Sequence, residues 1–364
     1  MTWAVMVALT LPTMTTTPPV QEDSAAGETL QSGAVVDKPG ADPAARSRRR
    51  VWAISGWIVL FSAAVAAFGV PTDPWYAFLW LWALSIAWRI DMPRRAHLAF
   101  ARDWVPVVVL LTVYNLSRGF ADELSDPHVQ ELIHADQWMF GWATGGTIPT
   151  VWLQQRLYDP LHVPWWEALI SWVYLSHFVA SFGAAIVLWL ISRARWAAFM
   201  RRWFFLTMAG LITYFVYPAA PPWWAAQYGY LTDAVERLSL RGGQEYGMHG
   251  AFKIVRLGQL ASNPVAAIPS LHTAFALFVV AFFLPRVRKR WWPLLLLYPL
   301  AMTFALVYAG EHYVVDVLIG WGYVAGTFIL VGLGERWWRR RQKSRTAAIS
   351  GCVDGVGSED PGRR

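Results

Sequence analysis

The chain has 364 residues, of which 56% are hydrophobic and only 15% are charged, whereas soluble domains carry about 25% charged residues. It holds 24 tryptophans, its net charge is +7 and its mean hydropathy is +0.33. These figures exclude a wholly disordered chain and, since Cys352 is the single cysteine, a disulfide scaffold; they predict an all-α polytopic membrane protein.

Both ends of the chain are too polar to form a packed core. Residues 1–50 are rich in Ser, Thr, Pro, Gly and Asp, and residues 336–364 are rich in Arg and polar residues. We therefore expect a disordered cytoplasmic N-terminal tail at 1–50, a transmembrane domain at 51–335, and a basic, disordered cytoplasmic C-terminal tail at 336–364.

Eight apolar segments between these tails approach the length of about 20 residues that a membrane-crossing helix needs. We therefore predict about eight transmembrane helices. In chain order they lie near 52–70, 74–90, 104–120, 165–192, 202–218, 268–285, 292–309 and 312–333.

The basic residues divide unequally between alternate connections. Of the 31 Lys and Arg residues, 25 lie in the two tails and in the turns that follow the second, fourth and sixth segments. The positive-inside rule then places both termini in the cytoplasm of an integral plasma-membrane protein. The other side keeps only Arg118, Arg156, Arg237, Arg241, Lys253 and Arg256.

Two long connections, about 121–164 and 219–267, fall on this outer side. The first is acidic but also rich in tryptophan and other apolar residues. Tryptophans need a surface to pack on, so we expect amphipathic pieces at the outer membrane interface rather than a plain solvated loop.

Ionisable residues at the ends of membrane spans are costly, and three of them are predicted at the outer face. His312 and Asp316 are spaced i,i+4 and share one helix face. A carboxylate beside one ring nitrogen leaves the other nitrogen free to act as base or nucleophile. A second imidazole, His272, can protonate a leaving group. Ser270, at a helix start, offers a hydroxyl and backbone N–H groups to an anion. Together these residues indicate phosphoryl transfer through a phosphohistidine.

The same residues resemble a known family. PSLH at 269–272 and HYVVD at 312–316 are similar to the second and third signature motifs of the type 2 phosphatidic acid phosphatase (PAP2) superfamily. The closer match is the branch that contains inositol phosphorylceramide synthases and sphingomyelin-synthase-like enzymes, in which the two histidines also lie about 40 residues apart. The stretch 217–224 resembles the APPW segment of that branch, and 114–119 resembles its Tyr-x-x-x-Arg-Gly segment. The resemblance covers about 100–335.

This resemblance implies a PAP2-like helical bundle with a catalytic site. His312 would be the nucleophile, Asp316 its orienting partner and His272 the acid for the leaving group. Ser270 would help to hold the phosphate, and Pro222 and Trp223 of the APPW segment would bind substrate. No metal or other cofactor is implied. From residue types alone, two histidines and an aspartate could also ligate a metal, and the APPW segment could be a helix stop with aromatic anchors.

The sequence departs from the broad superfamily at one cationic position. A Ser-Arg pair that precedes the nucleophilic histidine is replaced by Ala305 and Leu306, as it is in the synthase branch. The cation that binds the phosphate is therefore open. Outer-side candidates are Arg118, Lys253 and Arg256, with Arg118 preferred because it ends an apolar segment. His177 is either a polar contact between helices or a substrate contact.

The resulting hypothesis is an integral-membrane phosphotransferase that moves a phosphoinositol-type headgroup from a phospholipid to an acceptor alcohol, with its site facing the extracytoplasmic side. The alternative is a PAP2-type phosphatase that uses water and a lipid or polyprenyl phosphate. A transporter is a remote alternative because the polar positions concentrate at one face. The basic residues flank the membrane, so no nucleic-acid partner is expected. The oligomeric state stays open.

Overall fold

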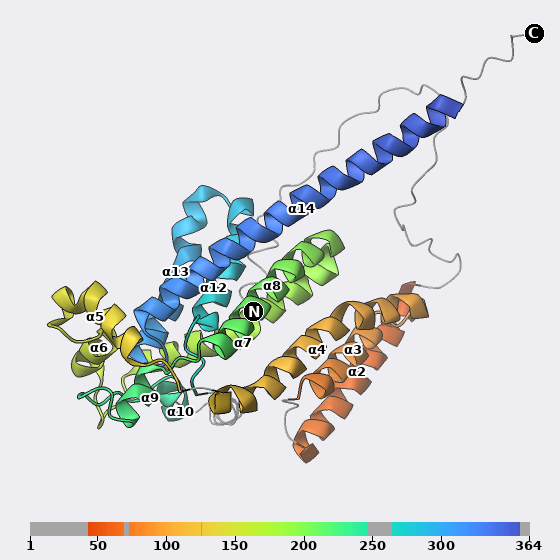
Figure 1. Cartoon of the computed structure of the whole chain (residues 1–364). Coiled ribbons are helices and arrows are strands. Elements are labelled where there is room, and N and C mark those ends of the chain that lie inside the picture. The colour runs from red at the N-terminus through yellow and green to blue at the C-terminus, as the bar shows by residue number, and fades with distance from the viewer. Residues whose placement is uncertain (1–42, 69–72, 125, 247–263, 357–364) are drawn as a thin grey trace, which may run out of the picture. The chain divides into compact units, whose positions relative to one another are not determined.

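The computed structural model describes residues 43–68, 73–124, 126–246 and 264–356 (Figure 1), without the side chains of 43, 114–124, 178, 343 and 345–356. Over these residues the chain is helical and forms isolated bridges in place of sheets. The all-α prediction is confirmed. The chain divides into two compact units, Met1–Val108 and Val109–Arg364.

The first unit consists of α2 (Pro43–Phe68), α3 (Pro74–Trp88) and the beginning of α4 (Arg94–Leu124). Helix α3 begins at Pro74 because the preceding Asp73 carboxylate accepts hydrogen bonds from two backbone N–H groups. Aromatic rings join the helices, as where Trp57 on α2 meets Trp80 on α3 edge to face. No residue in the apolar window of α2 is buried inside the protein, so that helix presents an apolar surface that suits lipid.

In the second unit, longer helices pack around one short helix. Helix α12 (Leu271–Phe283) contacts α7 (Trp165–Ile191), α8 (Arg193–Val216), α13 (Trp292–Tyr308) and α14 (Val314–Val356) (Figure 1). Nine of its thirteen residues are buried, as expected for a helix enclosed by others. Two 3-10 turns, Leu284–Arg286 and Lys289–Trp291, connect α12 to α13.

Each of the eight predicted spans coincides with a helix, but the count of eight transmembrane helices is not confirmed. Among the described residues, four helical stretches are long and apolar enough to cross a membrane. They lie in α2, α4, α13 and α14, and α7 makes a fifth if its two halves, inclined by 46°, form one span. Helices α3 and α12 have 15 and 13 residues, which is less than the bilayer requires. The long apolar helices establish a membrane protein.

Helix extends into both predicted tails. Helix α2 begins at Pro43, and α14 continues without a break to Val356. The runs of Ala, Arg, Lys and Gln at these places are good helix formers, and each continues a helix already begun in the apolar segment. The described helices thus cover 43–50 and 336–356, while residues 1–42 and 357–364 lie outside the described part, and the division into two tails and one domain stays a prediction.

The acidic loop before α7 forms two amphipathic helices, α5 (Gln130–Thr144) and α6 (Pro149–Leu157). In α5, Leu132, Ile133 and Asp136 are buried, whereas Trp138 and Trp142 are 86% and 85% exposed. Leu132 and Ile133 belong to a hydrophobic core that also includes Ala219, Ala220 and Tyr313. Because Tyr313 lies directly before α14, this core joins the loop to the end of α14 that carries the PAP2-like HYVVD segment.

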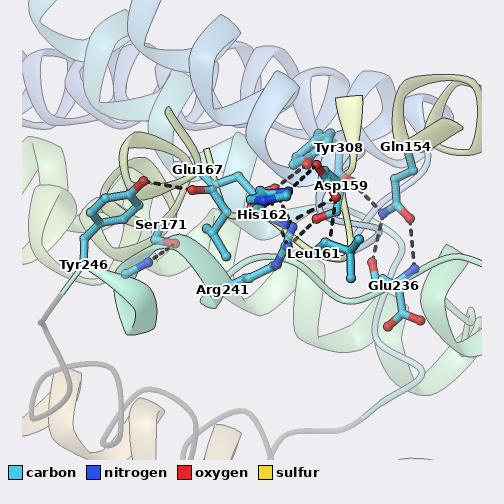
Figure 2. Close-up of polar contacts among 12 residues, drawn as sticks. Gln154, Asp159, Leu161, His162, Glu167, Ser171, Glu236, Arg241, Tyr246 and Tyr308 are labelled. Carbon is cyan, nitrogen blue, oxygen red and sulfur yellow. Dashed lines mark hydrogen bonds and ion pairs between the residues drawn. The ribbon is translucent and has the colours of Figure 1, made fainter. Parts of the chain in front are cut away.

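A polar cluster holds α10 (Arg241–Glu245) against α7 and α13 (Figure 2). The fully buried Glu167 accepts hydrogen bonds from Arg241 Nη1 at 3.0 Å and from the Tyr308 hydroxyl at 2.7 Å. A Cβ on Gly242 would lie 2.1 Å from the Glu167 carbonyl carbon, so only glycine permits this approach of the two backbones. The segment after α9 (Pro222–Gln227) is thereby fixed beside the start of α7 and the end of α13.

Candidate active site

His312 lies in the tight turn between α13 and α14. Gly310 has φ +75°, a conformation that favours glycine. The N–H of Glu311 bonds back to the Leu306 carbonyl at 3.0 Å, which closes the end of α13 as a Schellman-type turn does. A Cβ on Gly310 would meet the Glu236 carbonyl oxygen at 2.9 Å. The turn is therefore packed closely against the 235–239 segment, and this fixes the backbone at His312.

The structure brings together His272, His312 and Asp316. His312 Nδ1 lies 3.4 Å from Asp316 Oδ2, and His312 Nε2 lies 3.4 Å from His272 Nδ1. Asp316 is fully buried and His312 is 4% exposed. Asp316 Oδ2 also accepts the Tyr313 N–H at 2.9 Å, so its orientation is set by backbone as well as by imidazole. The contact with Asp316 occupies one ring nitrogen of His312 and turns the other toward His272.

Helices α12 and α14 approach each other closely at this site. The Ser270 N–H donates to the Asp316 carbonyl at 3.1 Å. A Cβ on Gly320 would lie 2.7 Å from the Ser270 carbonyl oxygen. Ser270 is fully buried, and its Oγ accepts the Thr273 N–H at 3.5 Å, as an N-cap does. The Ser270 side chain is thus engaged in capping α12.

His177 lies beside His272, with ring centroids 4.3 Å apart. It also ends the first half of α7, where that helix bends. The His272 ring also stacks on Tyr174, with ring centroids 5.3 Å apart. His177 therefore belongs to the same group of side chains, and the contact between α7 and α12 that it makes is compatible with either of its predicted roles.

The APPW-like segment is tied to the same turn. Pro222 is buried and begins α9, and the Trp223 N–H donates to the Gly310 carbonyl at 3.1 Å. This contact places Trp223 next to the residues that precede His312. The APPW-like segment thus ends α8, as its interpretation as a helix stop predicts. It also borders the candidate site.

The structure does not describe the side chains of the three predicted phosphate-binding cations. Arg118 is part of α4, but its side chain lies outside the described part of the chain, and so do Lys253 and Arg256 entirely. Within the described residues, no group of three His, Cys, Asp or Glu side chains has an arrangement that could hold a metal ion.

Asp136 is a site-supporting residue that the sequence did not single out. Its two carboxylate oxygens accept the N–H groups of Val314 and Val315, both at 2.9 Å. These are the first two residues of α14, so a side chain from α5 satisfies the N-terminus of the helix that carries Asp316. Burial raises the pKa of Asp136 to about 7, although the two backbone N–H groups act in the opposite direction. The 178 residues between donor and acceptor hide this contact from sequence inspection.

These helices and this pair of histidines define a membrane-embedded protein with a histidine-based site. A family model described as the PAP2 superfamily matches residues 146–330, half of the chain, and includes His272, His312 and Asp316. The chain belongs to the PAP2 superfamily.

Two curated relatives share sequence with this chain. Phosphoinositol dihydroceramide synthase of Bacteroides thetaiotaomicron is 31% identical over 120 residues, which are 32% of this chain and 39% of the relative. The catalytic subunit of inositol phosphorylceramide synthase from Saccharomyces cerevisiae is 24% identical over 291 residues, which are 74% of this chain and 65% of the relative. The chain thus spans less than two thirds of the length of either relative. No solved structure matches.

Proposed function

We propose that the protein is an integral-membrane phosphotransferase that moves a phosphoinositol-type headgroup from a phospholipid to an acceptor alcohol through a phosphohistidine. The observation that carries this proposal is the line of contacts from Asp316 to His312 to His272. PAP2 membership supports phosphoester chemistry, and the names of both relatives denote enzymes that make phosphoinositol-bearing ceramides.

The first step uses the His312 nitrogen that faces away from Asp316. The Nε2 lone pair attacks phosphorus, the bond from phosphorus to the lipid oxygen breaks, and His272 gives a proton to the departing alkoxide. The Asp316 carboxylate holds the Nδ1 proton and stabilises the positive charge that develops on the ring.

The second step reverses these roles. His272, now neutral, takes the proton of an acceptor hydroxyl, whose oxygen attacks phosphorus while the bond to Nε2 breaks. Water in place of the alcohol would give hydrolysis by the same residues, and the experiment must separate the two outcomes. The acceptor side of the proposal follows the ceramide named in the relatives. We also propose that the site faces the extracytoplasmic side of the plasma membrane.

The test uses purified full-length protein in detergent with phosphatidylinositol labelled in its inositol ring. We expect a new labelled lipid when ceramide is added, and little free inositol phosphate. Hydrolysis alone would instead release labelled inositol phosphate whether or not ceramide is present, and would favour the phosphatase alternative.

Two variants test the mechanism. His312→Ala should abolish product and prevent acid-labile labelling of the protein, whereas His272→Ala should lower the rate by about 100-fold or more because an acid–base catalyst is lost. His134→Ala is the matched control, since His134 is exposed on α5, and should keep the wild-type rate. Full activity of both His312→Ala and His272→Ala would refute the mechanism.

A further inference from the structure

Arg237 lies in the segment between α9 and α10 and forms an ion pair with Glu311, the residue that precedes His312. Its Nε and Nη2 groups donate to the Glu311 carboxylate at 2.9 and 3.0 Å. The Ser239 hydroxyl donates to the same carboxylate at 2.6 Å. Because Glu311 is bonded directly to His312 in the chain, this bidentate pair fixes a guanidinium next to the proposed nucleophile.

A second contact holds the plane of the guanidinium. Its central carbon lies 4.7 Å from the centre of the Trp223 ring, a cation–π distance. Trp223 is itself bonded through its N–H to the Gly310 carbonyl. Arg237 is thus positioned from two sides by residues anchored to the 310–311 turn, and one of them belongs to the APPW-like segment.

One edge of the guanidinium is left for another partner. Arginine has five N–H donors, and the Glu311 contacts use Nε and Nη2. Among the described residues, Nη1 has no hydrogen-bond acceptor. The Arg237 side chain is 28% exposed, whereas Glu311 is 8% exposed. The charge of Arg237 also acts on His272 through space, so its field reaches the second histidine of the site.

The two other outer arginines with described side chains are occupied differently. Arg241 donates to Glu167 and to the carbonyls of Asp159 and His162. Arg156 lies over the ring of Trp152 and donates to the carbonyl of that residue. Neither is joined to the turn that carries His312. Arg237 is therefore the best-placed of these three for an anion at the histidines.

We propose that Arg237 binds the phosphate of the substrate through its outward N–H groups, while Glu311 and Trp223 hold it in place. The inference rests on the proposed function and supplies the cation that the replacement of the family Ser-Arg pair by Ala305 and Leu306 removes. A guanidinium suits non-bridging phosphate oxygens in geometry and charge. It gains strength as negative charge grows on those oxygens during attack by His312.

The test measures binding of orthovanadate, an analogue of phosphate in its five-coordinate state, to the purified full-length protein by calorimetry. We expect Arg237→Gln to weaken binding tenfold or more. Glu311→Gln, which breaks the same ion pair but keeps the cation, should weaken it less. Arg156→Gln removes one outer positive charge that also lies on a tryptophan, and should bind as the wild type does.

Each other outcome contradicts the inference. Wild-type affinity in Arg237→Gln would overturn it and leave the proposed function standing. Equal losses in Arg237→Gln and Glu311→Gln would show that Arg237 only clamps the turn. If Arg237→Gln does not fold, Arg237→Lys takes its place and should bind several-fold more weakly, since an ammonium lacks the planar fork that pairs with Glu311 through two N–H groups and keeps others for an anion. Wild-type affinity would again refute the idea. No vanadate binding by an inactive wild-type protein would reject the proposed function as well.

Discussion

At the scale of single residues, the candidate site combines contacts between near neighbours in the chain with contacts between distant segments. His312 lies in the turn directly before α14, and Asp316 lies four residues on, in the first turn of that helix. Their short spacing brings them together, and a family motif adds His272. Asp136 and Arg237 escape prediction from spacing because their partners lie 178 and 74 residues away. The charge pattern offered one signal for Arg237, because it is among only six basic residues on the predicted outer side.

Asp136 makes a pH-dependent contribution to stability that can be measured. Burial raises its pKa from an ordinary 3.8 to about 7. Between these values the unfolded chain loses the proton while the folded protein keeps it, so rising pH favours unfolding. The contribution is fully present below about pH 3.8 and is lost as pH rises through about 7.

The variant that tests this is Asp136→Asn, which cannot ionise and offers one acceptor oxygen instead of two to the start of α14. The stability of the wild type relative to the variant should fall by about 1 kcal/mol per pH unit between pH 4 and 7. Thermal unfolding followed by tryptophan fluorescence measures it. A difference that is constant or grows with pH would contradict the raised pKa.

At the scale of helices, the apolar pattern located the eight helices that coincide with its segments, but not their lengths. Predicted segment 268–285 becomes a 13-residue α12 because Ser270 caps it and Pro285 lies in the 3-10 turn that follows it. Predicted segment 202–218 extends backward to Arg193, because Ser192 caps α8 and its arginines are good helix formers. Composition over a window measures lipid compatibility, whereas caps and prolines decide where a helix begins and ends.

The approach of α14 to Ser270 depends on one glycine, and a second glycine supplies the control. Gly320→Ala would place a methyl group 2.7 Å from the Ser270 carbonyl oxygen. We expect it to cost about 1–3 kcal/mol and to lower activity at least tenfold, because Asp316 and His272 would move apart. Gly322→Ala meets no atom within 4 Å and should be neutral or gain up to about 1 kcal/mol in helix propensity. Equal effects of the two would show that propensity, not close approach, governs α14.

The polar cluster in Figure 2 gives a second prediction for the contact between elements. Glu167→Gln removes the charge partner of Arg241 and should destabilise the protein by about 2–3 kcal/mol, below the full cost for a buried pair because Arg241 is 18% exposed. Glu167→Gln combined with Arg241→Gln should lose less than the sum of the two single variants. Strict additivity in chemical unfolding would mean that the pair does not couple α7 to α10.

At the scale of the whole molecule, the structure and the charge pattern answer different questions. Four or five described helical stretches pass as membrane spans by length and apolarity. The assignment of 25 basic residues to one side of the membrane and six to the other assumes eight crossings. Helices too short or too basic to span alone, such as α12 and α8, can still lie at membrane depth when other helices enclose them. Orientation is then a separate prediction, because charge bias acts through the connections and not through helix length.

That orientation can be tested with the one native cysteine. We predict that the C-terminal tail is cytoplasmic, so a membrane-impermeant maleimide should not label Cys352 in intact cells but should do so after permeabilisation. In a Cys352→Ser background, Arg288→Cys should be protected in the same way. His162→Cys, at a side chain that is 83% exposed, should be labelled from outside. The reason is energetic, since translocating the arginine-rich turns is opposed by the positive-inside bias. External labelling of Arg288→Cys would reverse the crossing of α12 and α13 and place His272 and His312 on the cytoplasmic side, where the acceptor lipid would have to come from the inner leaflet.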